Sequence, residues 1–152
     1  MDTVGVWSNT SALAERLEAR LGQGRRFVRS SHPADFSDVE LLVVAPDATG
    51  LAGLDVLRPR LALLPGGCVA ACRQVQAACA VSYGLGVQNT LTLSSITGEN
   101  VSVALQRELL TLSGRTVERQ EWVLPMDLSL GSADHFLCLV GALLLLDCPP
   151  GQ

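Results

Sequence analysis

Lysine is absent from this sequence of 152 residues, and all eleven basic residues are arginines. The absence excludes Schiff-base chemistry and a Walker-type phosphate-binding lysine, because both need a primary amine that arginine cannot supply. The arginines are scattered along the chain and the formal net charge is −4, which argues against a nucleic-acid-binding surface. We therefore expect no nucleic-acid partner.

Charged residues are also scarce, at 17% of the chain, whereas hydrophobic residues make up 48%. Such a composition can build a core and is not that of a mostly disordered chain. The length suits one hydrophobic core, so we predict a single α/β domain over residues 1–152.

Export and membrane signals are missing from the sequence as well. The first four residues include an acid and lack a basic segment followed by a long apolar one, so we expect a cytoplasmic protein. The most apolar run, residues 136–146, is far shorter than the roughly 20 residues that cross a bilayer, and Asp134 and Asp147 flank it. It predicts a buried helix and no membrane span.

The five cysteines are an odd number without an export signal, which favours reduced thiols over a disulfide framework. Cys68, Cys72 and Cys79 could bind zinc together with His32 or His135, but no Cys-x-x-Cys pair is present. Buried thiols are the favoured interpretation, and we predict neither a metal nor another cofactor.

Nucleophilic catalysis has equally little support. No Gly-x-Ser-x-Gly elbow occurs, and the adjacent Asp134 and His135 fit the start of a helix better than part of a catalytic triad. We predict no catalytic residues.

The first half of the chain alternates short apolar runs with helical patterns. This alternation predicts a mainly parallel, Rossmann-like sheet with helices on both faces. The expected strands are residues 3–7, 27–29, 39–44, 61–64 and 80–83. The expected helices are one carrying Leu13, Leu17 and Leu21, a short one at residues 51–57, and one at residues 69–78.

From Asn89 onward the apolar period changes to two, which predicts a small antiparallel meander over residues 91–124. Turn residues stand at 97–100 and at 113–114. An apolar C-terminal helix is expected to start near Ser132 and to end before Cys148.

A two-residue loop at Ser113-Gly114 would set the register of the last hairpin. It would place Glu108 opposite Arg119 and Gln106 opposite Glu121. The favoured interpretation is a solvated ladder of polar and charged pairs. A carboxylate site made by Glu108, Glu118 and Glu121 is the alternative.

Residues 80–85, Ala-Val-Ser-Tyr-Gly-Leu, resemble the strand that enters the last part of the ATP-binding central domain of Mur ligases. The order of elements is similar along most of the chain. Val4-Gly5-Val6 with residues 8–11 resembles the family's first strand and turn, and residues 43–47 resemble the strand carrying its Pro-Asp-His motif. Residues 131–146 stand where the family has an apolar helix introduced by Gly-x-His-Asn.

The positions that carry the chemistry of that family are altered here. The phosphate loop has no second glycine and no lysine, so it cannot wrap and neutralise a triphosphate in the usual way. The Pro-Asp-His position reads Pro46-Asp47-Ala48, the carbamoylated lysine has no counterpart, and Phe136 replaces the asparagine after His135. The resemblance thus implies the scaffold without ATP binding.

A polar cluster precedes the first helix and could either cap it or hold an anion. The cluster consists of Ser8, Asn9, Thr10 and Ser11. Together with Asp47, Tyr83 and Gly84 it would line the crevice at the carboxyl ends of parallel strands, where such folds bind ligands.

We therefore expect a non-catalytic protein-interaction or scaffold module that binds another protein or its own copy through the meander. The candidate surface is Gln106, Glu108, Glu118, Arg119 and Glu121. The alternative is a domain that senses a nucleotide or sugar nucleotide. A third possibility is an enzyme that uses the hairpin glutamates or the cysteines.

Overall fold

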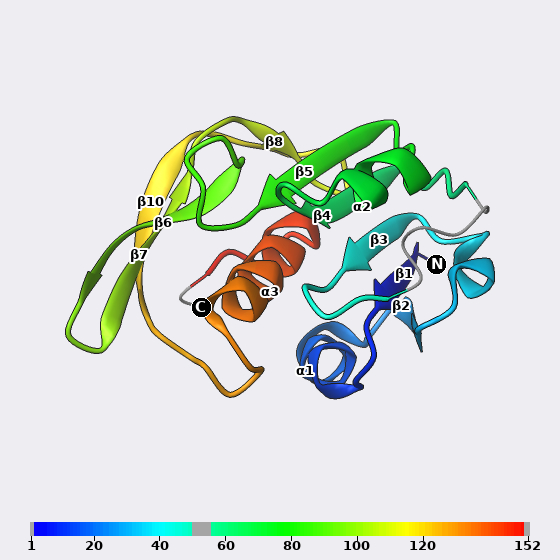
Figure 1. Ribbon diagram of the computed structural model, residues 1–152, viewed down its shortest axis with the longest axis horizontal. Helices are drawn as coiled ribbons and strands as arrows, with labels where there is room; N and C mark the ends of the chain where they lie inside the picture. The colour runs from blue at the N-terminus through cyan, green and yellow to red at the C-terminus, as the bar shows by residue number, and fades with distance from the viewer. Residues whose placement is uncertain (1, 50–55, 151–152) are drawn as a thin grey trace.

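Five parallel strands form the first part of a single large sheet (Figure 1). The structure is a computed structural model that describes residues 2–49 and 56–150. The parallel strands are β1 (Asp2–Trp7), β2 (Arg25–Ser30), β3 (Leu41–Val44), β4 (Leu61–Pro65) and β5 (Cys79–Tyr83). They confirm the five strands expected from the apolar runs, within one or two residues at most ends.

Antiparallel strands extend the same sheet. They are β6 (Leu91–Thr97), β7 (Asn100–Leu105) and β10 (Gln120–Pro125). Strand β6 pairs with β5 in parallel through Tyr83 and Leu91, whereas β7 runs antiparallel to both β6 and β10. The complete order is β10-β7-β6-β5-β4-β3-β1-β2, so the sheet has eight strands and is mostly parallel, and β10 and β2 are its two edges.

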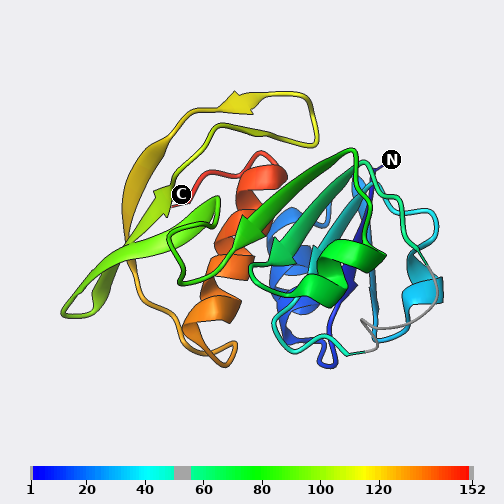
Figure 2. The ribbon, with the colours of Figure 1, turned by 45° about the horizontal axis from the view of Figure 1, so that its top comes forward.

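Helices cover both faces of the sheet, because side chains along each parallel strand point alternately to opposite sides. Leu41 and Val43 face α1 (Ala12–Leu21) and α3 (Ala133–Leu145), whereas Leu42 and Val44 face the other layer. That layer contains α2 (Val69–Gln74) and a 3₁₀ turn, η1 (Pro33–Phe36). In Figure 2, α2 lies in front of the parallel strands and α1 behind them.

The predicted helix over residues 69–78 is wrong in length, since α2 ends at Gln74. Val75 is extended and forms a parallel bridge with Leu57, whose backbone N–H donates to Gln74 O at 2.9 Å. A β-branched residue with a strand-like partner gains more from this pairing than from another helical turn. The helix predicted at residues 51–57 lies almost entirely outside the described residues.

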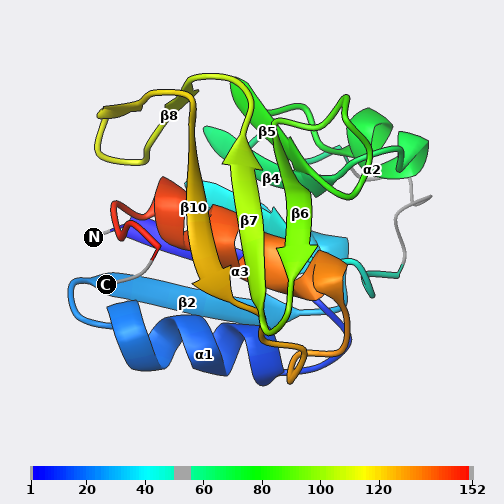
Figure 3. The same cartoon turned by 90° about the vertical axis from the view of Figure 1, so that its left-hand side faces the viewer.

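Helix α3 lies between the parallel and antiparallel parts of the sheet. Every residue from Phe136 to Leu145 is buried, and Figure 3 shows β6, β7 and β10 passing over the helix. Within residues 2–49 and 56–150, no helix combines the length and apolar character that a bilayer crossing needs.

Candidate functional site

The carboxyl ends of β1 and β3 lie side by side and bring the first polar turn against Asp47. Trp7 is in register with Val44, so the residues that follow each strand meet at one edge of the sheet. Ser8 Oγ donates to both Asp47 carboxylate oxygens, at 3.0 and 3.1 Å, and the Asn9 backbone N–H donates to Oδ2 at 3.2 Å. Asn9 Nδ2 also donates to the Asp47 carbonyl oxygen at 2.9 Å.

The Asp47 carboxylate therefore fills the polar turn between β1 and α1, where the Ser8 hydroxyl and the Asn9 N–H could otherwise bind an external anion. Its hydrogen bonds come from residues 8 and 9, which precede the first residue of α1, Ala12. Ser8 is only 1% exposed, so its hydroxyl is committed to this internal contact.

The remaining two residues of the turn make local contacts. The Thr10 N–H donates to Ser8 Oγ at 3.2 Å. Ser11 is the N-cap residue of α1, but its hydroxyl donates to Glu15 Oε1 at 3.1 Å and makes no capping bond to the backbone. Ser11 thus stands at the N-cap position, as the sequence suggested for one of these residues, but its side chain makes no capping bond, whereas Ser8 does bind a backbone N–H of the turn.

His135 joins α3 to the Asp47 cluster. Its Nε2 lies 3.7 Å from Asp47 Oδ1, and its Nδ1 lies 2.8 Å from Ser132 Oγ. Ser132 is the N-cap of α3 and accepts a bond from the His135 N–H at 3.3 Å. The neighbour of His135 is thus Asp47 and not the adjacent Asp134, and the serine hydroxyl serves to start the helix.

Sequence reasoning missed Ser132 as a member of this cluster. A serine three residues before a polar side chain at the expected start of a helix is a capping signal, and it could have identified Ser132.

Tyr83 is a core residue at the carboxyl end of β5. It is 1% exposed, its hydroxyl donates to Val44 O at 2.6 Å, and burial raises the pKa of this phenol far above its ordinary value. The Cys138 thiol also points at Val44 O, with a 3.9 Å sulfur–oxygen distance, and burial raises its pKa to about 12. Both groups are neutral donors inside the protein.

A cavity of about 270 Å³ lies at the ends of β4 and β5, beside the start of α3. Its wall includes Gly66, Gly84, Asn89 and Asp134. Asn89 is 2% exposed and its Oδ1 has no hydrogen-bond partner within the described chain. A Cβ on Gly66 would lie 1.7 Å from that oxygen, so only glycine fits there. Tyr83 and Gly84 line this cavity, whereas residues 8–11 do not.

The predicted register of the last hairpin is wrong. The two-stranded sheet of β8 (Leu109–Leu110) and β9 (Thr116–Val117) pairs Leu109 with Val117, and Thr111 N–H donates to Arg115 O at 2.8 Å. The loop has three residues, with Gly114 at φ 92°. One added residue shifts every pairing, so Glu108 does not face Arg119.

The five residues of the predicted interaction surface consequently have other neighbours than the two-residue loop predicted. Gln106 turns away from Glu121, and its Nε2 donates to Val87 O and Asn89 O, both at 2.7 Å. Glu121 lies opposite Ala104 of the neighbouring strand β7. Glu108, Glu118 and Arg119 line one shallow depression, and no ion pair joins them in the described structure.

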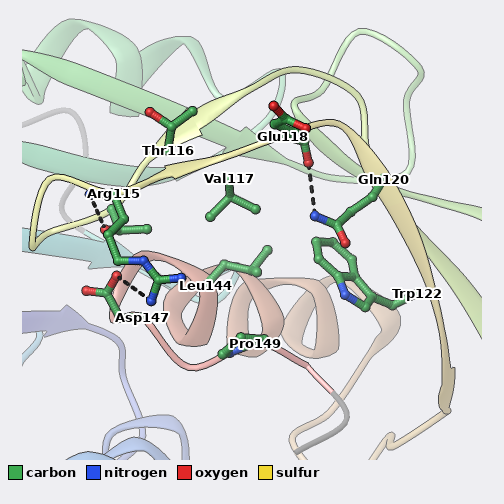
Figure 4. A pocket seen from close by; sticks show the side chains of 10 residues that line it. Arg115, Thr116, Val117, Glu118, Gln120, Trp122, Leu144, Asp147 and Pro149 are labelled. Atoms are coloured by element: carbon green, nitrogen blue, oxygen red, sulfur yellow. Dashed lines mark hydrogen bonds and ion pairs between the residues drawn. The ribbon is translucent and has the colours of Figure 1, made fainter.

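A larger cavity, of about 400 Å³, lies between the β8–β9 hairpin, the start of β10 and the end of α3 (Figure 4). Trp122 and Leu144 form its apolar wall, and Arg115 lies 3.9 Å from Asp147 at its rim. Glu118 also borders it, so the predicted interaction surface and this hollow are continuous.

The candidate metal ligands do not converge. Cys68, Cys72, Cys79, Cys138 and Cys148 are all free thiols, and no three metal-binding side chains gather within residues 2–49 and 56–150.

No family model matches this sequence, and neither a curated protein nor a solved structure matches it. The resemblance to the Mur ligase central domain therefore remains a prediction from short motifs.

Proposed function

We propose that this chain is a non-catalytic protein-interaction or scaffold module of the cytoplasm. Its Rossmann-like arrangement would be that of a Mur ligase central domain without ATP binding. The observation that carries the proposal is the Asp47 carboxylate bound to Ser8 and to the Asn9 N–H. A triphosphate would have to displace this carboxylate without a lysine to offset the added charge.

Binding through the meander is supported by its open edge. Strand β10 ends the sheet, so alternate backbone N–H and C=O groups on its outer side have no strand partner in the described chain. Val123, near the middle of β10, is 70% exposed. An exposed edge with an apolar side chain favours the addition of a strand from another protein.

Retention of a partner by the immobilised protein tests the proposal. We expect wild type to retain a partner from lysate of the native cell that Val123→Lys does not retain, because a charged side chain blocks edge pairing. Leu128→Lys is the matched control, since Leu128 is 57% exposed but lies in the loop between β10 and α3 and not on a strand. Hydrolysis of ATP by the purified protein, or partner binding that Val123→Lys leaves unchanged, would overturn the proposal.

The unpartnered Asn89 Oδ1 beside the 270 Å³ cavity favours one alternative, a small-ligand sensor. A nucleotide or sugar nucleotide that binds only the folded state would raise the midpoint of thermal unfolding. Gly66→Ala would remove that response, because the added Cβ overlaps the Asn89 side chain.

A further inference from the structure

The two open edges of the sheet carry charges of opposite sign. Strand β2 contains Arg25, Arg26 and Arg29 and no acidic residue. The other edge has Glu121 within β10 and Glu118 two residues before it, and the intervening Arg119 leaves one net negative charge in this segment. Three of the eleven arginines thus lie within this one edge strand.

Three of these charged side chains are exposed and have no partner in the described structure. Arg26, Glu118 and Glu121 are exposed, and their side chains make no hydrogen bond or ion pair within the described residues. Arg29 has one long bond, 3.5 Å, to Ser8 O. Arg25 turns inward instead and donates to Leu146 O at 3.1 Å.

Arg26 lies within β2 and Glu121 lies within β10, whereas Glu118 and Arg119 precede β10 and the chain bends at Arg119. When the two edges pair as neighbouring strands with Arg26 opposite Glu121, these two side chains lie on the same face of the extended sheet and can form an ion pair. Arg29 is three residues further along β2, so its side chain points to the other face.

Pairing of like edges lacks this complementarity. Two β2 edges would bring arginines together, and two β10 edges would bring Glu121 near its own copy. Like charges directly opposite each other destabilise a strand pair. The charge pattern thus selects contact between unlike edges.

We propose that a second copy of this chain adds its β10 edge to the β2 edge, giving head-to-tail self-association. The inference rests on the proposed interaction function and names its partner. Such a contact uses two different surfaces of each molecule, so each copy keeps one free edge until a ring closes or a chain grows.

Light scattering coupled to size exclusion tests the proposal. The mass of wild type should rise above 16.1 kDa with protein concentration and fall back in about 0.5 M salt, which screens exposed charges. Arg26→Glu and Glu121→Arg should each give a monomer with an unchanged circular-dichroism spectrum and unfolding midpoint. The double variant should assemble again, because the pair is restored with its charges exchanged.

Mixing the two single variants tests directly whether the β2 edge of one copy contacts the β10 edge of another. Arg26→Glu places a glutamate at the contact position of β2 and Glu121→Arg places an arginine at the contact position of β10, so the mixture should assemble although each component alone does not. A wild type that is monomeric at every concentration, or a double variant that stays monomeric, overturns the inference. If that monomer still retains a different partner in a manner sensitive to Val123→Lys, the interaction function stands and only self-association fails.

Discussion

Asp47 is the residue whose removal should change binding most clearly. We expect Asp47→Ala to lower the free energy of unfolding by about 1 to 3 kcal/mol, the usual effect of losing hydrogen bonds to a charged group. The change also frees the Asn9 N–H and the Ser8 hydroxyl. Inorganic phosphate should then stabilise the variant and leave wild type unchanged, as chemical denaturation with and without phosphate can measure.

Asp38→Ala is the matched control for that experiment. Asp38 is exposed, and no described residue donates a hydrogen bond to its carboxylate. Equal stabilisation of wild type, of Asp38→Ala and of Asp47→Ala by phosphate would contradict the internal occupation of the anion site.

Asp127 gives a pH-dependent contribution to stability. Hydrogen bonds from Ser129 and from Arg16, with Arg16 Nη1 at 2.9 Å, hold its pKa at about 2, below the ordinary 3.8. A lowered folded-state pKa stabilises the folded protein above the unfolded pKa, and this stabilisation is lost as the pH falls. The pair is exposed, so the effect is small.

Urea unfolding at successive pH values measures that contribution. Asp127→Asn should be less stable than wild type at pH 6, and the difference should shrink between about pH 4 and about pH 2. Asp38→Asn serves as the control and should show no such pH-dependent difference. A difference that persists unchanged at low pH would show that the Asp127 carboxylate charge is not its cause.

At the scale of elements, β3 and β4 were the most predictable strands, because each is a short, almost continuous apolar run that the sheet buries on both faces. The edge strand β2 has only Phe27 and Val28 as an apolar signal. The C-terminal end of α2 and the register of the β8–β9 hairpin were not predictable in this way. Val75 leaves the helix because Leu57, distant in sequence, offers it a bridge. The hairpin depends on whether the turn takes two residues or three, a choice that Ser113-Gly114 leaves open.

Gly114 is the residue that permits the longer turn. Its φ is 92°, and a Cβ there would meet nothing within 4 Å, so Gly114→Ala would cost conformational energy without a steric clash. We expect a loss of about 1 to 2 kcal/mol confined to the hairpin. Hydrogen exchange should show a less protected Thr111 N–H, which bonds Arg115 O. Gly98→Ala is the matched control, because Gly98 has a φ of 63° in the turn between β6 and β7, and it should leave that protection unchanged.

At the scale of the whole molecule, one part of the candidate site could be predicted from the sequence and another part could not. The meeting of Ser8, Asn9 and Asp47 follows from parallel topology, since residues after neighbouring strands share one edge. The contact of His135 with Asp47 and the isolation of Asn89 Oδ1 depend on where α3 and the loop before β6 pack. No local pattern of residues specifies that packing.

The position of α3 has a consequence for the order of folding during synthesis. The helix packs against β3, β4, β5, β6 and α1, yet every one of those elements is translated before it. Until residues 133–145 have left the ribosome, Leu41, Val43 and Leu63 keep one apolar surface open to water. The main core therefore cannot close until α3 has been synthesised. Over that interval the nascent chain exposes apolar surface to which chaperones bind.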